Sequence, residues 1–220
     1  MQSLEAWLDA TLGHTPVNLQ LFERALTHAS LGEENYERLE FLGDRVLGVI
    51  IADWLYSLFP DEPEGKLSRR LNVLVSGDTC AAIARRLGVA PHLRLGKQAL
   101  ADGAFDSDNI LGDVVESLIG ALWLDGGLDA ARAFVRKAWA DRVDSHDKAP
   151  KHPKSALQEW AAANNRKAPA YELLGRSGPH HAPKFVVKVS IRGVGEAEAE
   201  GLNKQEAETA AAQRLLEKLS

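Results

Sequence analysis

Apolar residues along the first 145 positions recur every three to four residues, in segments separated by glycine, proline and polar clusters. This spacing predicts a succession of amphipathic helices with no strand among them. The longest is a helix over 37–59, which a proline-containing turn ends. Two further helices, over 110–124 and 128–143, are separated by Asp125-Gly126-Gly127. Residues 1–145 are therefore predicted to form an all-α domain.

The pattern changes after residue 145. Residues 146–152 have no periodic apolar positions and include proline, which predicts a short linker. Beyond them, the strict alternation of apolar residues from Phe185 to Ile191 predicts a half-buried strand. Residues 153–220 are therefore predicted to form a small α+β domain with the order α-β-β-β-α, over 154–164, 169–174, 184–191, 194–201 and 204–219.

Five carboxylates lie on two of the most apolar predicted helices. Glu37, Glu40 and Asp44 are three and seven residues apart, and Asp113 and Glu116 are three apart. Residues at these spacings share one face of a helix. A carboxylate on a helix apolar enough to be buried is costly unless a positive charge compensates it. A divalent cation that prefers oxygen ligands, Mg²⁺ or Mn²⁺, would supply that charge.

The alternative is an ordinary solvent-exposed acidic face, which is the usual setting of such a pair. The second cluster has no Lys or Arg between residues 110 and 119. The residues alone leave the two interpretations about equally supported. The seven histidines and the single Cys80 make no zinc-binding spacing, and Cys80 itself is expected to be a small buried side chain. The chain also has no phosphate-binding glycine loop, so no nucleotide cofactor is implied.

Apolar residues make up 45% of the chain and charged residues 26%, and the net charge is −5. Acid is concentrated in residues 1–152, whereas residues 153–220 hold ten Lys and Arg against eight Asp and Glu. A single cysteine excludes an intramolecular disulfide framework and indicates a reducing compartment. The first residues lack the features of a signal peptide, and no run approaches the ~20 apolar residues of a membrane span. We therefore expect a cytoplasmic protein with no membrane partner.

These segments carry a family resemblance. Residues 35–47 resemble the signature of the ribonuclease III family, with 25–30 matching its upstream element and 113–127 its second acidic helix. Residues 154–220 resemble a double-stranded-RNA-binding domain, through matches at 153–159, 178–182, 185–187 and 204–212. The resemblance covers essentially the whole chain, in the domain order of the bacterial enzymes of this family. It implies an endonuclease that cuts double-stranded RNA.

The resemblance also implies the chemistry of the site. Four carboxylates match the family's ligands for Mg²⁺, for which Mn²⁺ can substitute, namely Glu40, Asp44, Asp113 and Glu116. Of these, Asp44 and Glu116 are the strongest candidates for catalysis. Glu37 and Glu64 match acidic positions of the family's cleft, where RNA contact or support of the ligands is expected. Glu64 fits equally well as a first-turn glutamate that the helix dipole favours.

The family acts as a homodimer, and Phe41 matches a residue that inserts into the partner subunit. The alternative for Phe41 is ordinary packing in the core of its own chain. Gly43 and Gly48 each cost ~1 kcal/mol relative to alanine inside a helix. A close approach of another helix would explain that cost.

Duplex RNA is recognised mainly by shape, through phosphates and 2′-hydroxyl groups. The resemblance implies RNA contacts from the first helix, the loop before the central strand and the start of the last helix, by Gln158, Glu159, His180, His181 and Lys204. Two departures predict modest affinity. Asn203-Lys204-Gln205 has one lysine where the family has a run of lysines, and 101–108 lacks the arginines found in relatives.

The implied activity is metal-dependent hydrolysis within double-stranded RNA that leaves 5′-phosphate and 3′-hydroxyl ends with short 3′ overhangs. The expected substrates are precursors of ribosomal RNA, messenger RNA and other structured transcripts. The alternative is a protein that binds double-stranded RNA without cutting it, but such a protein has no need of a complete carboxylate set. A helical scaffold would leave the acids on apolar helices unexplained.

Overall fold

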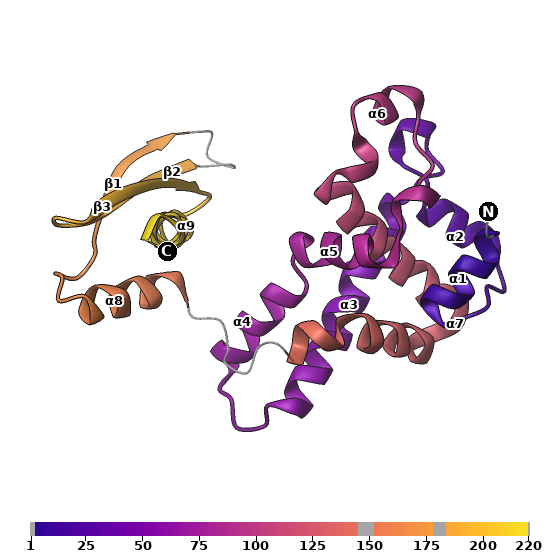
Figure 1. The fold of residues 1–220 in the computed structure, drawn as a ribbon, viewed down its shortest axis with the longest axis horizontal. Helices are drawn as coiled ribbons and strands as arrows, with labels where there is room; N and C mark the ends of the chain where they lie inside the picture. Colours follow the sequence, from indigo (N-terminus) through magenta and orange to yellow (C-terminus); the bar gives the residue numbers. More distant parts are fainter. Residues whose placement is uncertain (1–2, 145–151, 178–183, 220) are drawn as a thin grey trace. The chain divides into compact units, whose positions relative to one another are not determined.

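In the part of the chain that the structure describes, the first unit, within Met1–Pro150, is built from helices, and the second, within Lys151–Ser220, is built from three strands and two helices (Figure 1). The computed structural model describes residues 3–144, 152–177 and 184–219. The predicted linker, 146–152, lies outside the described residues except for its last position. The predicted fold class, an all-α unit followed by an α-β-β-β-α unit, is confirmed.

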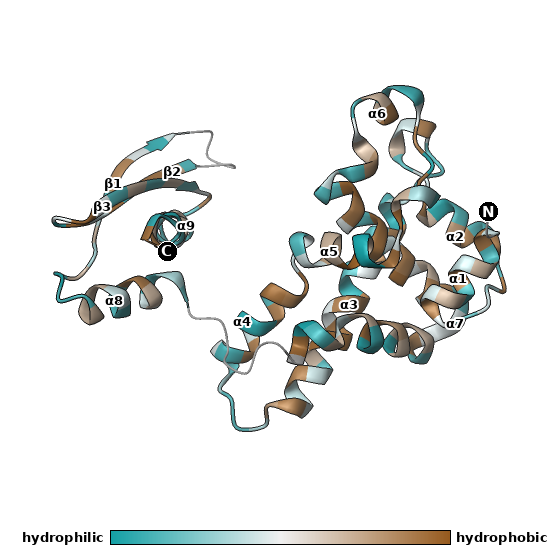
Figure 2. Cartoon of the chain, viewed as in Figure 1, coloured by the Kyte–Doolittle hydropathy of each residue, from teal (hydrophilic) through white to brown (hydrophobic). Residues whose placement is uncertain are grey.

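The helices of the first unit follow the apolar periodicity. They are α1 Leu4–Leu12, α2 Leu19–Ala25, α3 Glu37–Leu58, α4 Glu64–Leu74, α5 Gly77–Leu87, α6 Lys97–Ala101 and α7 Asp108–Asp144, with short 3-10 helices at Ala29–Leu31, Ala90–His92 and Ala104–Asp106. Apolar and polar residues alternate along α4 and α8 in Figure 2, as expected of amphipathic helices. Among the described residues, no helix is both long and apolar enough to cross a membrane.

Helix α7 has one break, at the position where the sequence predicts two helices. Gly127 has a φ of 75° and a ψ of −172°, a conformation that is essentially restricted to glycine. Asp125, just before the break, accepts hydrogen bonds from the amides of Val17 and Asn18 at 2.8 and 2.7 Å. The side chain thereby fastens the segment before α2 to α7.

The core of the first unit lies where α3, α5 and α7 pack together. Leu47 and Ile50 of α3, Ile83 of α5, and Val114 and Leu118 of α7 are all buried there. Contact of these apolar faces removes them from water, which is the main source of stability for such a helical unit.

One buried charge was not predicted. Arg70 of α4 is buried and donates from Nε and Nη2 to the two carboxylate oxygens of Glu62, at 2.8 and 2.9 Å. Its guanidinium also lies 3.7 Å from the centre of the Phe59 ring. The planar guanidinium suits both contacts, and together they tie the turn between α3 and α4 to α4.

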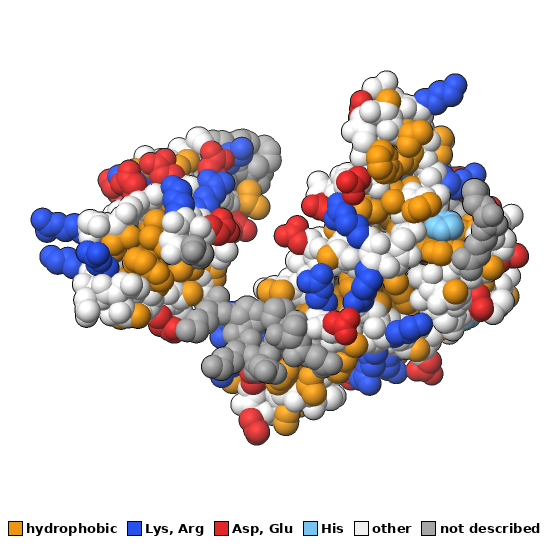
Figure 3. Space-filling model, in the orientation of Figure 1, with side chains coloured by type: hydrophobic (Ala, Val, Ile, Leu, Met, Phe, Trp, Pro, Cys, Tyr) orange, Lys and Arg blue, Asp and Glu red, His pale blue; other side chains and the backbone are white. Residues whose placement is uncertain are grey.

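The second unit is a three-stranded antiparallel sheet in the order β1-β2-β3. Its elements are α8 Pro153–Ala163, β1 Ala170–Ser177, β2 Lys184–Ile191, β3 Gly195–Gly201 and α9 Lys204–Leu219. Leu157 of α8, Val189 and Ile191 of β2, and Ala211 and Leu215 of α9 form a separate small core. Acidic side chains lie over the strands in Figure 3, and Glu196, Glu198 and Glu200 alternate along β3.

Strand β1 is longer than predicted. The sequence analysis ends it at residue 174, whereas the structure continues pairing to Ser177, which lies opposite Lys184. The register shifts between Leu173 and Gly175, so the alternation of side chains is interrupted there. A pattern with a period of two cannot continue through such a shift, which explains the early predicted end.

Candidate active site

Helices α3 and α7 cross in direct backbone contact. A β carbon on Gly43 of α3 would overlap the main-chain carbonyl of Glu116, and one on Gly120 of α7 would overlap that of Leu39. The close approach of the two helices therefore explains why both positions are glycine. Gly48, for which the same reason was expected, has no atom within 4 Å of an added β carbon. The crossing at Gly43 brings the two acidic segments together.

Three of the predicted ligands act on one another across this crossing. Burial first, and then the negative charges of Asp113 and Glu40, raise the pKa of Glu116 to about 7. Burial, followed by the charge of Asp113, also raises the pKa of Glu40, and burial raises that of Asp113. Removing carboxylates from water and placing them side by side both oppose ionisation. These three carboxylates are partly buried, whereas Glu37, which the sequence placed in the same cluster as Glu40, is exposed.

The fourth predicted ligand, Asp44, has a different partner. Its carboxylate pairs with Arg45, the next residue along α3. Among the described residues, no three or more His, Cys, Asp or Glu side chains stand in the arrangement of a metal site. The structure thus brings Glu40, Asp113 and Glu116 within electrostatic reach of one another, but it does not assemble even three of the four side chains around one point.

The donor set nevertheless fits a divalent cation. It consists of carboxylate oxygens, with no histidine among them, and this favours Mg²⁺ or Mn²⁺ over zinc. Burial first, and then repulsion by Asp113 and Glu40, raises the pKa of Glu116, and a bound cation would compensate for both. Arg45 acts in the opposite direction and lowers the pKa of Glu116. Its effect is the smallest of the causes, and its side chain is exposed and paired with Asp44.

Two residues next to the carboxylates were not assigned a role from the sequence. The hydroxyl of Tyr36 donates to Oδ2 of Asp113 at 3.3 Å, and the thiol of Cys80 donates to Oε1 of Glu116 at 3.7 Å. Cys80 is fully buried, as expected, but it lies against the candidate catalytic glutamate. The position of Cys80 in the sequence gives no sign of this contact. For Tyr36 there was a signal, because it directly precedes Glu37 and its aromatic ring carries a hydroxyl group.

The two further acidic residues lie on the surface. Glu37 is exposed at the start of α3 and contributes to the raised pKa of Glu40 after burial and Asp113. Glu64 is exposed in the first turn of α4, where Oε1 accepts a hydrogen bond from Ser68 at 2.6 Å. Glu64 is not among the charges that shift the pKa of Glu116, so the structure does not join it to the other carboxylates.

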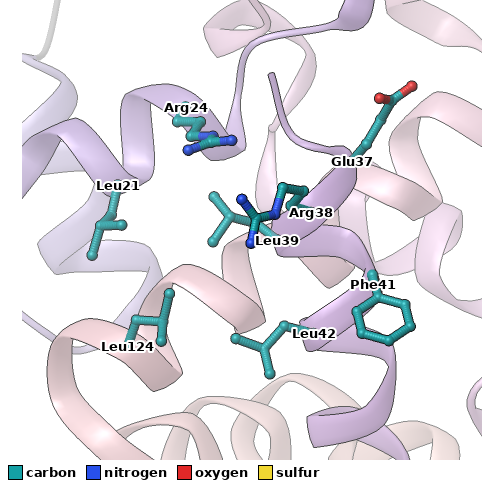
Figure 4. A pocket seen from close by; sticks show the side chains of 8 residues that line it. All are labelled: Leu21, Arg24, Glu37, Arg38, Leu39, Phe41, Leu42 and Leu124. Atoms are coloured by element: carbon teal, nitrogen blue, oxygen red, sulfur yellow. The ribbon is translucent and has the colours of Figure 1, made fainter. Parts of the chain in front are cut away.

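A largely apolar cavity of about 630 Å³ lies beside the start of α3 (Figure 4). Its lining is Leu21, Arg24, Glu37, Arg38, Leu39, Phe41, Leu42 and Leu124. Phe41 is 65% exposed, so it does not pack in the core of its own chain as the alternative interpretation required. In Figure 4, Glu37 points away from the apolar side chains, while Leu42 and Leu124 stand on the cavity's lower side.

The predicted RNA-binding residues of the second unit are only partly described. Gln158 and Glu159 are exposed on α8, beside the buried Leu157. Lys204 is the first residue of α9, and its Nζ lies 3.8 Å from Glu208, which also binds Lys154 at 2.5 Å. His180 and His181 lie outside the described residues.

Comparison with known proteins gives matches over both units. Residues 18–143 match the family model of Ribonuclease-III-like domains, and 153–219 match the double-stranded RNA binding motif. The chain is 61% identical to Ribonuclease 3 of Zymomonas mobilis over 215 residues, which cover 98% of this chain and 87% of that protein. Its identity to Ribonuclease 3 of Caulobacter vibrioides is 46%, over 96% of this chain and 94% of that protein.

Solved structures agree with the first unit. The nuclease domain of ribonuclease III from Campylobacter jejuni is 31% identical with a TM-score of 0.61, over 64% of this chain and 97% of that one. A second structure of that domain, described as flexible in a region involved in dimer formation, has a TM-score of 0.60 at 31% identity. It covers 61% of this chain and 95% of its own.

Proposed function

Because the chain belongs to the ribonuclease III family and is an endoribonuclease specific for double-stranded RNA, we propose that the carboxylates of α3 and α7 bind the metal ion on which this family depends. The proposed ligands are Glu40, Asp44, Asp113 and Glu116, and the proposed ion is Mg²⁺ or, in its place, Mn²⁺. The observation that carries this proposal is the crossing of α3 and α7 at Gly43, which brings the carboxylates together at Glu116. There, burial and the charges of Asp113 and Glu40 raise the pKa of Glu116 to about 7.

When bound, such an ion activates water and neutralises charge on the phosphate and on the leaving oxygen. The chain's own residues position the carboxylates that would bind the ion. Partial burial at the helix crossing limits the contact of Glu116 with water, and the thiol of Cys80 donates to one of its oxygens. Asp44 would hold the ion in place of its present partner Arg45, and the guanidinium of Arg45 could then pair with a phosphate. Asp44 and Glu116 are the proposed catalytic carboxylates.

We assign catalysis to residues 1–145 and duplex binding to residues 153–220, joined by 146–152. In the second unit, Gln158, Glu159, His180, His181 and Lys204 are the proposed contacts to 2′-hydroxyl groups and phosphates. Glu37 and Glu64 are proposed to face the RNA at the edge of the catalytic site. The products are 5′-phosphate and 3′-hydroxyl ends with short 3′ overhangs, and the substrates are structured transcripts in the cytoplasm, such as precursors of ribosomal RNA.

We also propose that the enzyme is a homodimer. Phe41 is exposed at the rim of an apolar cavity that its own side chain helps to line. In a twofold dimer the same patch serves both subunits, so Phe41 of each chain can enter the cavity of the other. Burial of an exposed phenylalanine in an apolar cavity contributes to association through the hydrophobic effect.

The test is cleavage of a long RNA duplex, with matched single strands beside it, in Mg²⁺ and in EDTA. Wild type should cut only the duplex and only with metal. Glu116→Gln should bind the duplex but fail to cut it, while Glu5→Gln, a change at an exposed glutamate of α1, should cut normally. Tight binding by wild type without cutting in Mg²⁺ or Mn²⁺ would instead favour the non-cleaving alternative.

A further inference from the structure

Tyr36 joins the two helices that carry the acidic cluster. It stands immediately before α3, is only 5% exposed, and donates from its hydroxyl to Oδ2 of Asp113 on α7, at 3.3 Å. Among the described residues, this phenol is the one side-chain hydrogen-bond donor to Asp113. The contact spans 77 positions of sequence, so only the fold creates it.

The backbone of Tyr36 is fixed independently of this hydroxyl. Its amide donates to the carbonyl of Thr27, and its carbonyl accepts from the amides of Leu39 and Glu40, each at 2.9 Å. Its ring is tilted against that of His28, with the ring centres 5.8 Å apart. The ring and the backbone therefore remain in place if the hydroxyl alone is removed.

We infer that Tyr36 is a positioning residue, whose hydroxyl holds one oxygen of Asp113 and thereby directs the other toward the metal ion. This inference rests on the proposed function, in which Asp113 is a metal ligand. A carboxylate on a helix can turn about its side-chain bonds, and a hydrogen bond to the oxygen that does not face the metal restricts that rotation. The contact also couples Asp113 to the first turn of α3, where Glu40 lies.

Two other roles for this hydroxyl lead to different results. If the hydrogen bond only satisfies a buried phenol, its loss affects folding and not metal affinity. If the hydroxyl competes with the metal for Asp113, its loss strengthens metal binding. Tyr36→Phe separates these cases because it removes one oxygen atom and keeps the ring.

The experiment is calorimetric titration of Mn²⁺ into the full-length protein in the absence of RNA. Tyr36→Phe should raise the dissociation constant about tenfold, the lower end of the effect of losing a group that orients a ligand. Tyr56→Phe is the matched control, since Tyr56 lies on α3, the helix that Tyr36 precedes, and is 76% exposed. It should bind Mn²⁺ as wild type does.

Cleavage provides a second readout. For Tyr36→Phe, the Mg²⁺ concentration that gives half the maximal rate should rise in the same proportion, while the rate at saturating Mg²⁺ approaches that of wild type. The unfolding temperature in EDTA shows whether the variant is folded. Unchanged or tighter Mn²⁺ binding by Tyr36→Phe would overturn the inference.

The titration also separates this inference from the proposed function. If wild type binds Mn²⁺ and Glu116→Gln binds it weakly, the metal site stands, and Tyr36→Phe then decides the role of the hydroxyl. If wild type binds no Mn²⁺, or Glu116→Gln binds it as well as wild type does, the proposed site and the inference built on it both fail.

Discussion

Gly43 of α3 lies so close to the main-chain carbonyl of Glu116 on α7 that no β carbon fits between them. Gly120 meets Leu39 in the same way from the other side. Because Gly43 stands between Glu40 and Asp44, this contact sets the separation of the acidic segments. The cluster thus depends on the absence of a side chain as much as on the carboxylates themselves.

Gly43→Ala should therefore destabilise the protein and abolish cleavage. The added methyl group meets backbone atoms, which cannot turn aside as a side chain would, so a loss of about 3 kcal/mol in unfolding free energy is expected. Urea unfolding and duplex cleavage measure the two effects. Gly48→Ala is the control on the same helix, where the added methyl has open space. It should be neutral or stabilise by up to ~1 kcal/mol. Equal stability of the two variants would contradict the close contact.

The same pair shows what sequence reasoning can reach. The apolar period predicts α3, and it predicts two helices where the structure has the kinked α7. The acid spacing singles out Glu40 and Glu116, because this feature is also local. The sequence gives the same expectation for Gly43 and Gly48, although of these two only Gly43 contacts another helix. Local sequence patterns do not determine which two helices cross or at which residues they cross.

Other differences have the same origin. The sequence predicts only that Cys80 is buried, because its contact with Glu116 forms only when α5 packs on α7. The parallel bridge between Thr27 and Arg94 joins two segments without any strand pattern. Arg70 reads as one more polar residue of α4, and its burial against Glu62 follows from the turn after α3.

The raised pKa of Glu116 predicts how stability depends on pH when no metal is bound. Its pKa of about 7 in the folded protein exceeds the ordinary value of 4.5 that is expected in the unfolded chain. Between these values the folded state binds more protons, so the contribution of Glu116 to stability is full below pH 4.5 and is lost as the pH rises through about 7. In EDTA, Glu116→Gln should then be more stable than wild type at pH 8 and about equally stable at pH 4.

Urea unfolding at the two pH values, with and without Mg²⁺, measures this difference. Mg²⁺ should stabilise wild type more than Glu116→Gln, because binding to the folded state raises its stability. Glu5→Gln, on the surface of α1, should follow the wild-type curve at both pH values. If Glu116→Gln is less stable than wild type at pH 8 in EDTA, the negative charge of Glu116 does not destabilise the metal-free protein, and the prediction is wrong.

Phe41→Ala should weaken the proposed dimer without unfolding the subunit. The side chain is 65% exposed in the single chain, so its loss removes little internal packing. Loss of a phenylalanine from an apolar cavity of the partner should cost about 2 to 4 kcal/mol in association, which is roughly a factor of 30 or more in the dissociation constant. Sedimentation at several concentrations measures it. Val49→Ala, another exposed apolar site on α3, is the control. Unaltered dimerisation of Phe41→Ala would place the interface elsewhere.

Lys204 supplies a test of RNA binding that is independent of the metal site. It begins α9, where the helix N-terminus favours phosphate, and its side chain is 61% exposed. Lys204→Ala should weaken duplex binding and reduce the slope of log affinity against log salt concentration by about one, since one fewer counterion is released. Lys218→Ala removes the same charge near the other end of α9, where Nζ donates to the carbonyl of Glu196. Binding in EDTA at several salt concentrations compares the two. If both changes reduce the slope equally, the effect is one of net charge, and Lys204 makes no contact of its own with phosphate.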